Sequence, residues 1–447
     1  METKSTLTAC PGCDLLIPIP AVPDGHYLAC GRCGKVVSKS YHNSINRVLA
    51  LSFTGLLLYL PAMLLPLMTL SSLGIKEKGN VLDTCISFYV NGYYLVSVIV
   101  FVTAVVVPFL KLFLPFCVAL SLKIGKKPSF LKSALKMLTH LEEWGMVEVY
   151  LLGILITLIK MGDVASIEFN PGFFCFIGLV LISMAIIIYL DRNLFWYNLD
   201  NSEPHPGDKR LDRITNQIIQ NPERTQTAAQ RGLMSCHDCG RLVSLDEGES
   251  AECPRCDSSL HFRITGSIST TWALIVTSLI LFLPANMLPI MKVNFLGIPD
   301  ESTILDGIIY FFKHGSFGIG LIILIASILV PLFKIIGLII ILLTIRSRNN
   351  RFLKQKATMF RFIEFIGRWS MLDIFVVALL SVLVDFGFLS SIHTAPGATY
   401  FCMVVVATMS AARVFDPRIM WDRCDPLNNA GREQTIQRGS YGKSTGY

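Results

Sequence analysis

The sequence predicts an all-α, multi-pass membrane protein made of two tandem four-helix transmembrane repeats, each preceded by a small cytoplasmic ribbon. Three observations predict this fold class: apolar stretches long enough to cross a bilayer, paired Cys-x-x-Cys motifs ahead of each half, and self-similarity at a nearly fixed offset. Of the 447 residues, 52% are hydrophobic and only 16% are charged. This composition excludes a disordered chain, a collagen-like chain and a secreted disulfide scaffold.

Transmembrane helices account for the apolar composition. A helix needs about 20 predominantly apolar residues to span the hydrocarbon core of a bilayer, and runs of this kind recur along the chain. Eight spans are predicted, at residues 48–70, 93–122, 144–161, 171–190, 272–292, 316–345, 362–388 and 398–415.

The charged residues are distributed as a membrane topology requires. Lys and Arg are concentrated before span one, between spans two and three, four and five, and six and seven, and after span eight, whereas the intervening loops are mostly acidic. The positive-inside rule then places both termini in the cytoplasm, as an even number of spans also demands. Topology therefore explains the net charge of +7, and no nucleic-acid partner is expected.

Two sets of four cysteines precede the two halves, each made of two Cys-x-x-Cys pairs. Pairs at this separation suit four thiolates that converge on one metal ion, whose binding would stabilise a segment with few apolar side chains. Thiols in the cytoplasm stay reduced, which argues against disulfides, and a redox site would need only one pair. The ribbons are thus predicted to be zinc ribbons with two structural zinc ions, iron remaining open as the alternative. The predicted ligands are Cys10, Cys13, Cys30, Cys33, Cys236, Cys239, Cys253 and Cys256.

The self-similarity indicates an internal repeat. Residues 59–68 align with 282–291, residues 107–111 with 330–334, and residues 144–148 with 369–373. Because each half has an even number of helices, both halves share one orientation and the expected symmetry axis runs along the membrane normal. The predicted domains are a first zinc ribbon (1–47), a first transmembrane domain (48–196), a linker (197–235), a second zinc ribbon (236–265), a second transmembrane domain (266–423) and a disordered tail (424–447).

In combination, the twin Cys-x-x-Cys ribbons and the PAxxLPxM, VPxxK and WxMx[DE] segments resemble the paraquat-inducible protein A family, over about residues 10 to 423. The resemblance implies a protein of the bacterial cell inner membrane. It also implies a periplasmic partner with MCE domains, which bridges the periplasm and moves membrane lipids between the inner and outer membranes.

Two prolines lie in each of the predicted spans one and five. Each proline lacks the amide hydrogen that would bond to the carbonyl four residues earlier. Because that helical hydrogen bond is lost, the proline bends or breaks the helix. Broken helices often line cavities in transporters, although a packing kink is the plainer interpretation. The four prolines are Pro61, Pro66, Pro284 and Pro289.

An intramembrane lysine marks a candidate transport site. Lys334 precedes Arg346 by 12 residues, which places it roughly 18 Å from that membrane edge at about 1.5 Å per residue. A lysine so deep needs a partner, and Asp373 in span seven is the expected one. A polar cluster at this depth fits a proton relay or a path for polar headgroups, whereas a static ion pair is the plainer alternative. The expected cluster is Ser327, Lys334, Ser370, Asp373 and Thr408.

The first half keeps the charges of this cluster but loses hydroxyl groups. Lys111 and Glu148 correspond to Lys334 and Asp373. Ala104, Gly145 and Ser183 correspond to Ser327, Ser370 and Thr408. The second half is therefore expected to be the working half, and the first half the more structural one.

The leading hypothesis is an inner-membrane component of an intermembrane lipid transport system that works with a periplasm-spanning MCE-domain protein and is proton-coupled through the second-half cluster. The alternatives are a stand-alone small-molecule or ion transporter, and a non-transporting membrane scaffold built on metal ribbons. An enzyme is not expected, because the chain lacks HExxH, GxSxG and phosphate-loop motifs and each ribbon has four thiols with no open metal position. An adjacent gene for an MCE-domain protein would favour the leading hypothesis.

Overall fold

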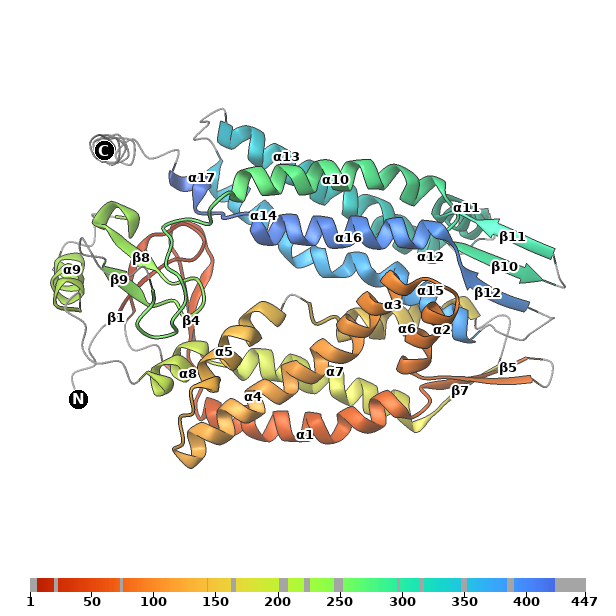
Figure 1. Cartoon of the computed structure of the whole chain (residues 1–447), viewed down its shortest axis with the longest axis horizontal. Helices are drawn as coiled ribbons and strands as arrows, with labels where there is room; N and C mark the ends of the chain where they lie inside the picture. Colours follow the sequence, from red (N-terminus) through yellow and green to blue (C-terminus); the bar gives the residue numbers. More distant parts are fainter. Residues whose placement is uncertain are drawn as a thin grey trace, which may run out of the picture.

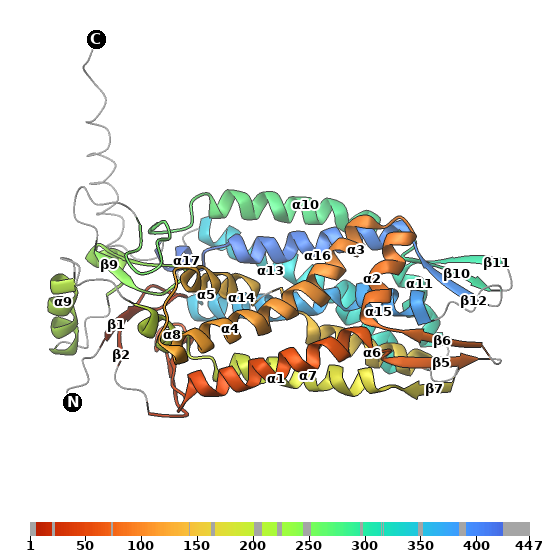
Figure 2. The same cartoon turned by 60° about the horizontal axis from the view of Figure 1, so that its bottom comes forward.

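A computed structural model describes residues 6–19, 23–72, 75–142, 144–161, 166–200, 208–220, 226–244, 252–295, 298–313, 315, 317–346, 352–383 and 390–422. The molecule is elongated, with two cysteine ribbons at one end, β-hairpins at the other and long helices between them (Figures 1 and 2). We call these the ribbon end and the hairpin end. The predicted tail at 424–447 lies outside the described residues.

The first ribbon and the first half occupy the chain up to residue 199. The ribbon consists of β1 (Thr6–Ala9), β2 (Leu16–Ile19), β3 (Tyr27–Ala29) and β4 (Val36–Lys39). The first half contains α1 (Ser44–Leu64), β5 (Met68–Ser72), β6 (Ile75–Gly79), α2 (Val81–Val90), α3 (Tyr94–Phe101), the π-helix η1 (Val102–Val106), α4 (Val107–Ile124), α5 (Phe130–Leu141), α6 (Val147–Met161), β7 (Ser166–Phe169), α7 (Pro171–Tyr189) and α8 (Arg192–Leu199).

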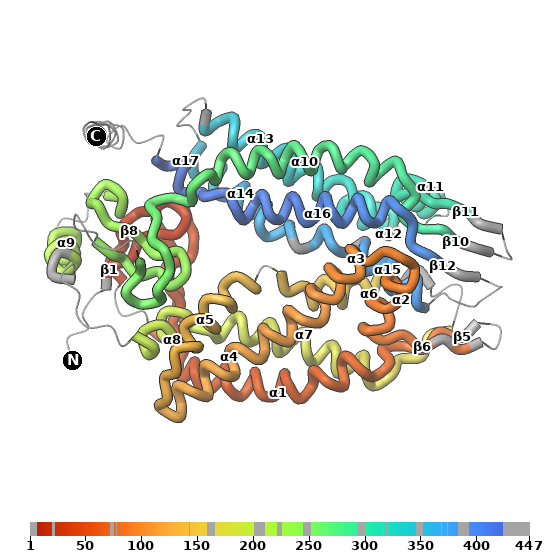
Figure 3. Tube along the Cα trace, viewed as in Figure 1, coloured from red at the N-terminus to blue at the C-terminus, as the bar shows by residue number. Residues whose placement is uncertain are grey.

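The second ribbon and the second half follow a helical connection. The connection contains α9 (Asp208–Gln220) and η2 (Ala229–Arg231), and the ribbon contains β8 (Leu233–Ser235) and β9 (Leu242–Ser244). The second half contains α10 (Ser267–Met287), β10 (Met291–Phe295), β11 (Ile298–Ser302), α11 (Ile304–Lys313), α12 (Phe317–Ile323), the π-helix η3 (Leu324–Leu329), α13 (Val330–Arg346), α14 (Leu353–Gly367), η4 (Arg368–Met371), α15 (Leu372–Leu383), β12 (Ser390–Thr394), α16 (Pro396–Val414) and α17 (Ile419–Asp422). Figure 3 traces the chain from the red first ribbon into α1 and from the green second ribbon into α10.

Seven helical segments among the described residues are long and apolar enough to cross a membrane. The predicted third span, residues 144–161, is the exception: it forms α6, whose apolar part, Val147–Leu158, is shorter than those seven. Helical structure stops at Leu141 and resumes at Val147 in the first half, whereas α14, η4 and α15 follow one another without a gap in the second half. The eight-span topology therefore stays a prediction.

Each half also carries a three-stranded antiparallel sheet at the hairpin end, so the prediction of an all-α fold is incomplete. The strand order is β6-β5-β7 in the first half and β11-β10-β12 in the second. Met68 pairs with Gly79 and Phe169, and Met291 pairs with Ser302 and Thr394. These strands are only four or five residues long, too short to show a clear alternating pattern in the sequence.

The prolines and glycines of the repeated motifs connect each first helix to its sheet. Pro61 and Pro284 lie inside α1 and α10, whereas Pro66 and Pro289 lie beyond the ends of these helices, so only the first proline of each pair can bend a helix. The amide of Gly397 donates a 2.9 Å hydrogen bond to the carbonyl of Pro289. The corresponding segments of the first half also lie close together. The carbonyl oxygen of Pro66 is 2.5 Å from the position that a Cβ on Gly172 would take.

A π-helix precedes the VPxxK segment in both halves. Proline has no amide hydrogen, so Pro331 cannot donate the usual helical hydrogen bond to the carbonyl four residues earlier. The amide of Val330 instead donates to the carbonyl of Ile325, five residues back. The first half shows the same shift, in which Val107 donates to Val102. This local widening sets the position of the lysine three residues after each proline.

The two halves meet through corresponding helices. Helix α6 packs against α15, α15 also contacts α2, and α16 contacts α3. The rings of Tyr150 on α6 and Phe375 on α15 are 5.3 Å apart between centroids and nearly perpendicular. A Cβ on Gly153 would lie 3.3 Å from the Cβ of Phe375. Tyr150 and Phe375 belong to one continuous apolar core that contains buried residues of both halves.

Candidate metal centres and transport cluster

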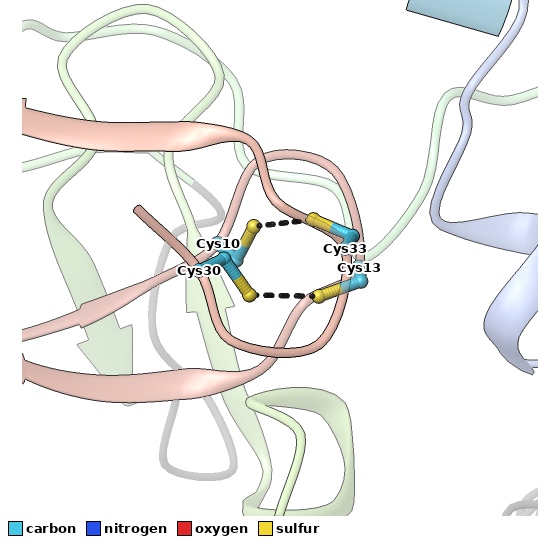
Figure 4. A group of neighbouring side chains, drawn as sticks. All are labelled: Cys10, Cys13, Cys30 and Cys33. Atoms are coloured by element: carbon cyan, nitrogen blue, oxygen red, sulfur yellow. Dashed lines mark hydrogen bonds between the residues drawn. The ribbon is translucent and has the colours of Figure 1, made fainter. Parts of the chain in front are cut away.

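The eight predicted metal ligands come together in two clusters of four buried cysteines. The sulfur atoms of each cluster all lie within 4.8 Å of one another. In the first cluster, Sγ of Cys10 is 3.4 Å from Sγ of Cys33, and Sγ of Cys13 is 3.5 Å from Sγ of Cys30 (Figure 4). A tetrahedral zinc ion with sulfur ligands at about 2.3 Å would hold them roughly 3.8 Å apart. The donor set and its geometry therefore fit a metal ion with four thiolate ligands.

The second cluster has nearly the same dimensions. Sγ of Cys236 is 3.4 Å from Sγ of Cys256, and Sγ of Cys239 is 3.5 Å from Sγ of Cys253. Contacts among the four thiols lower the pKa of two cysteines in each cluster and raise the pKa of the other two. A bound metal cation would stabilise all four as thiolates.

The ribbons dock on the membrane halves in a crossed arrangement. The cysteines of the first ribbon share a buried apolar cluster with α10, α13, α14, α16 and α17 of the second half. The cysteines of the second ribbon share one with α1, α4, α5 and α8 of the first half. Each ribbon therefore packs against the half that does not follow it in the sequence.

An arginine holds the first ribbon to the second half. Nη2 of Arg263 is 2.9 Å from Oδ2 of Asp14, directly after the Cys10–Cys13 knuckle, and 2.6 Å from Oδ1 of Asp422 on α17. Asp14 is 2% exposed, and burial raises its pKa although Arg263 opposes the shift. The guanidinium of Arg32 also lies over the ring of Trp421, 4.5 Å from its centroid. These contacts anchor the ribbon at a fixed position on α17.

The second ribbon is held by the polar face of α5. Nζ of Lys132 is 3.2 Å from Asp257, and Nζ of Lys136 is 3.3 Å from Asp238. Asp238 also accepts a 2.7 Å hydrogen bond from Ser258, and these partners together with His237 lower its pKa to about 2. The polar face of α5 thus contacts a protein surface.

Lys334 is completely buried in the second half. Its side chain has an exposure of 0%, and Nζ donates a 2.8 Å hydrogen bond to Oγ1 of Thr408 on α16. The hydroxyl of Thr408 in turn donates a 3.0 Å hydrogen bond to the carbonyl of Val405. The structure therefore brings together two of the five residues that the sequence places in the transport cluster.

The other members of the cluster lie on adjoining elements. Ser327 is in η3 and Ser370 is in η4, two segments that contact each other. Both residues are 0% exposed, and neither hydroxyl has a hydrogen-bond partner among the described residues. Asp373 is the second residue of α15, but its side chain lies outside the part of the chain that the structure describes.

A cavity of about 330 Å³ leads to Lys334 and Thr408. Most of its wall comes from α13, α14 and α16 of the second half, and Glu142 and Ile187 of the first half complete it. Glu364 and Phe365 on this wall are exposed. Lys334 is therefore buried within the protein but borders a space between the two halves.

The corresponding site of the first half is packed differently. Lys111 is 8% exposed and lines a small cavity with Glu142, Ser183 and Arg192. Oγ of Ser183 lies 3.4 Å from Oε1 of Glu148. A Cβ on Gly145 would come within 2.6 Å of Cδ and Nζ of Lys111, so the lysine side chain fills the space that a serine would need.

The sequence analysis missed the residues that link the ribbons to the helices. Nη2 of Arg413 on α16 is 2.7 Å from Nδ1 of His140, whose Nε2 is 3.5 Å from Oδ1 of Asp238. Burial lowers the pKa of His140, Asp238 opposes the shift, and Arg413 and Lys136 strengthen it. One signal was available: Lys132, Lys136 and His140 are spaced by four residues, which puts them in one row along a helix and suits a single acidic partner.

Similarity to known proteins extends over most of the chain. The model of the family described as Paraquat-inducible protein A matches residues 45–200 and 268–425. The chain is 32% identical over 418 residues to the Intermembrane transport protein PqiA of Escherichia coli (strain K12), covering 93% of this chain and 95% of that protein. It is 28% identical over 418 residues to the Probable intermembrane transport protein of Haemophilus influenzae, covering 92% and 95%.

A third relative has a different name. The chain is 30% identical over 413 residues to the Lipophilic envelope-spanning tunnel protein A of Escherichia coli (strain K12), covering 92% of this chain and 90% of that protein. No solved structure matches the chain.

Proposed function

This chain belongs to the paraquat-inducible protein A family, and from that premise we propose that it is the inner-membrane component of an intermembrane lipid transport system. The names of its relatives support this proposal, since they describe intermembrane transport and an envelope-spanning tunnel. The similarity extends over 92–93% of the chain in each case, so it includes both halves.

The proposed partner is an MCE-domain protein that spans the periplasm. In this topology both termini and both ribbons are cytoplasmic, and the two three-stranded sheets face the periplasm. The separation of ribbons and hairpins to opposite ends of the helices supports this orientation (Figure 1). The sheets of the hairpin end are then the parts of the chain that reach toward such a partner.

One observation carries the assignment of the transport site: a lysine with 0% exposure, bound by a threonine hydroxyl, borders a cavity between apolar helices. Burying an ionisable group in a membrane is costly, so such residues mark ion or substrate pathways. We assign Ser327, Ser370 and Asp373 to the same cluster, which would couple transport to proton movement. A static ion pair between Lys334 and Asp373 is the competing explanation.

The first half is proposed to be a structural counterpart. The two halves would be tandem repeats related by an axis along the membrane normal. Two observations support the repeat: the family model matches each half separately, and Tyr150 and Phe375, which correspond at an offset of 225 residues, meet edge to face between the halves. The domain division predicted from the sequence follows from this repeat.

The ribbons are proposed to hold one structural zinc ion each. Zinc would complete two closed four-sulfur sites and supply folding energy to two short segments. The residues that hold it would be the eight cysteines of the two clusters. Iron bound to the same ligands is the alternative, and metal analysis of the purified protein distinguishes the two.

Purification with native partners retained tests the proposed function. The protein is extracted in mild detergent, co-purifying proteins are identified, and bound lipids are analysed by mass spectrometry. An MCE-domain protein and lipid in the same complex would support the proposal. A chain that moves a small solute by itself, with neither partner nor lipid attached, would instead support a stand-alone transporter.

A further inference from the structure

The cavity beside Lys334 approaches the ribbon end between the two halves. Arg413 lines the cavity and follows Thr408 by five residues on α16, so it lies roughly 7.5 Å nearer the ribbon end at about 1.5 Å per residue. Glu142, directly after α5 of the first half, lines the same cavity. A path from the ribbon end to Lys334 therefore passes between α5 and the last turn of α16.

A chain of polar contacts crosses this path. Arg413 has only donors, so Nδ1 of His140 accepts the 2.7 Å hydrogen bond from its Nη2. The ring proton of His140 is then on Nε2, which lies 3.5 Å from Oδ1 of Asp238. The second half, the first half and the second ribbon are thus joined through one imidazole ring.

Asp238, the residue that the second ribbon contributes to these contacts, is held firmly in place. The side chain of Asp238 is 9% exposed and also contacts Lys136 on α5, the helix that carries His140. Ser258, from the second knuckle of the same ribbon, donates a 2.7 Å hydrogen bond to it. The ribbon therefore offers His140 a fixed carboxylate, and its position sets the orientation of the imidazole ring.

We propose that the Asp238–His140–Arg413 chain is a latch that keeps the cavity narrow at its ribbon end, so that the second ribbon controls access to Lys334 from that side. The functional meaning of this access rests on the proposed function. The latch itself is formed by residues of this protein and can be tested without a partner or a lipid. Contacts such as Tyr150 with Phe375 on α6 and α15 are apolar and weakly directional, so they resist a tilt of one half against the other less specifically than hydrogen bonds do. The latch contacts are directional hydrogen bonds, and a tilt would break them.

Thiol labelling of the cavity wall tests the latch without partner or lipid. Ala412 lines the cavity and is 8% exposed, so Ala412→Cys places a thiol on its wall. The purified protein is treated with a maleimide, and labelling of this one peptide is followed by mass spectrometry, because the chain has 13 native cysteines. We expect His140→Ala to increase the labelling rate about ten-fold or more, as loss of a hydrogen bond to a charged group allows.

Two matched variants isolate the latch. Lys132→Ala removes a contact between the same helix and the same ribbon but does not involve α16, so the rate should stay within about two-fold of the parent. His140→Gln keeps one acceptor and one donor and should keep the slow rate. Arg413→Met removes the latch contact from the side of α16 and should increase the labelling rate as His140→Ala does. It therefore tests the latch even if His140→Ala does not fold.

Three results would overturn the proposal. The first is an unchanged labelling rate in His140→Ala and Arg413→Met. The second is an equal increase in Lys132→Ala, which would assign the effect to ribbon docking as a whole. The third is a His140→Gln rate as fast as that of His140→Ala, which would exclude the hydrogen-bond chain. None of these results bears on whether the protein transports lipid, so failure of the latch is separable from failure of the proposed function.

Discussion

Lys334 and Lys111 occupy corresponding positions but have different surroundings. Lys334 borders a cavity of about 330 Å³ and is bound by Thr408, whereas Lys111 lies over Gly145 in a much smaller space. The buried hydroxyls of Ser327 and Ser370 have no partner among the described residues, and the first half has Ala104 and Gly145 in their place. The second half therefore has two buried hydroxyl groups that the first half lacks at the corresponding positions.

Exchanging the small residues of the two sites should affect stability in opposite ways. Gly145→Ser puts a side chain against the flexible end of Lys111, which can move aside, so we expect a loss of folding stability below the roughly 1–3 kcal/mol typical of overpacking. Ser370→Ala removes a buried hydroxyl without a described partner, so stability should be unchanged or slightly higher. Thermal unfolding in detergent measures both. Severe destabilisation by Ser370→Ala would show that its hydroxyl supports the fold.

Individual residues differed in how well they could be predicted. The eight cysteines were identifiable because metal coordination fixes their spacing in the chain, and the structure gathers them. Thr408 was expected in the same cluster as Lys334, whereas depth in the membrane indicated Asp373 as the partner of that lysine. The contacts of His140 and Arg263 were not predictable, because they join segments more than 90 residues apart whose docking depends on the whole fold.

At the scale of elements, the repeated Pro-Gly start of α7 and α16 has a steric reason. Proline suits the first position of a helix, and the following glycine packs on the chain that leaves α1 or α10. A Cβ on Gly397 would come within 2.6 Å of the carbonyl oxygen of Pro289, and a Cβ on Gly172 within 2.5 Å of that of Pro66. These contacts are with backbone, which no side-chain rotation can relieve.

Gly397→Ala should therefore destabilise the second half by about 1–3 kcal/mol, because the α10–β10 connection, which contains Pro289, has to move. Gly318→Ala is the control: Gly318 is exposed on α12 with no heavy atom within 4 Å of the added Cβ. Helix propensity alone then applies, and alanine should stabilise by about 0.5–1 kcal/mol. Unfolding midpoints measure the difference, and equal midpoints for the two variants would contradict the steric argument.

The crossed docking of the ribbons gives a prediction for metal removal. Cys236→Ser should lose the metal of the second ribbon and expose α5 and α8 of the first half, because that ribbon packs on them. Cys10→Ser should expose α14 and α17 of the second half. Hydrogen–deuterium exchange read by peptide mass spectrometry checks both variants. Faster exchange in the half that follows the altered ribbon in the sequence, with the other half unaffected, would contradict the crossed arrangement.

Element prediction succeeded where a pattern was long and failed where it was short. Seven long apolar helices were predictable from span length alone. At residues 130–141, an apolar stripe in the sequence predicts an interfacial helix, and the stripe is formed by Phe130, Ala134, Met137, Leu138 and Leu141. In the structure Ala134 and Leu138 are buried, but Phe130 and Met137 are exposed, and Leu131 and Leu135 are buried in their place. The ribbon that covers α5 selects the buried face, and no local pattern contains that information.

At the scale of the whole molecule, the topology can be tested by labelling an introduced cysteine. Ser391 lies in β12 at the hairpin end, opposite the ribbons. In intact cells, Ser391→Cys should react with an impermeant maleimide added from the periplasmic side. The ribbon cysteines should not react under the same conditions. Reaction of the introduced thiol only after the cytoplasm is opened would contradict the proposed orientation and the even number of spans.

The central claim is that lipid movement depends on the buried polar cluster of the second half. The most direct measurement compares lipid transfer by Lys334→Met and by Lys111→Met, each reconstituted at equal abundance with the MCE-domain partner. Both variants remove one buried lysine, so both lose some stability. We predict that Lys334→Met reduces transfer at least about ten-fold, whereas Lys111→Met retains most of it. Equal loss in both variants, or normal transfer by Lys334→Met, would contradict the account.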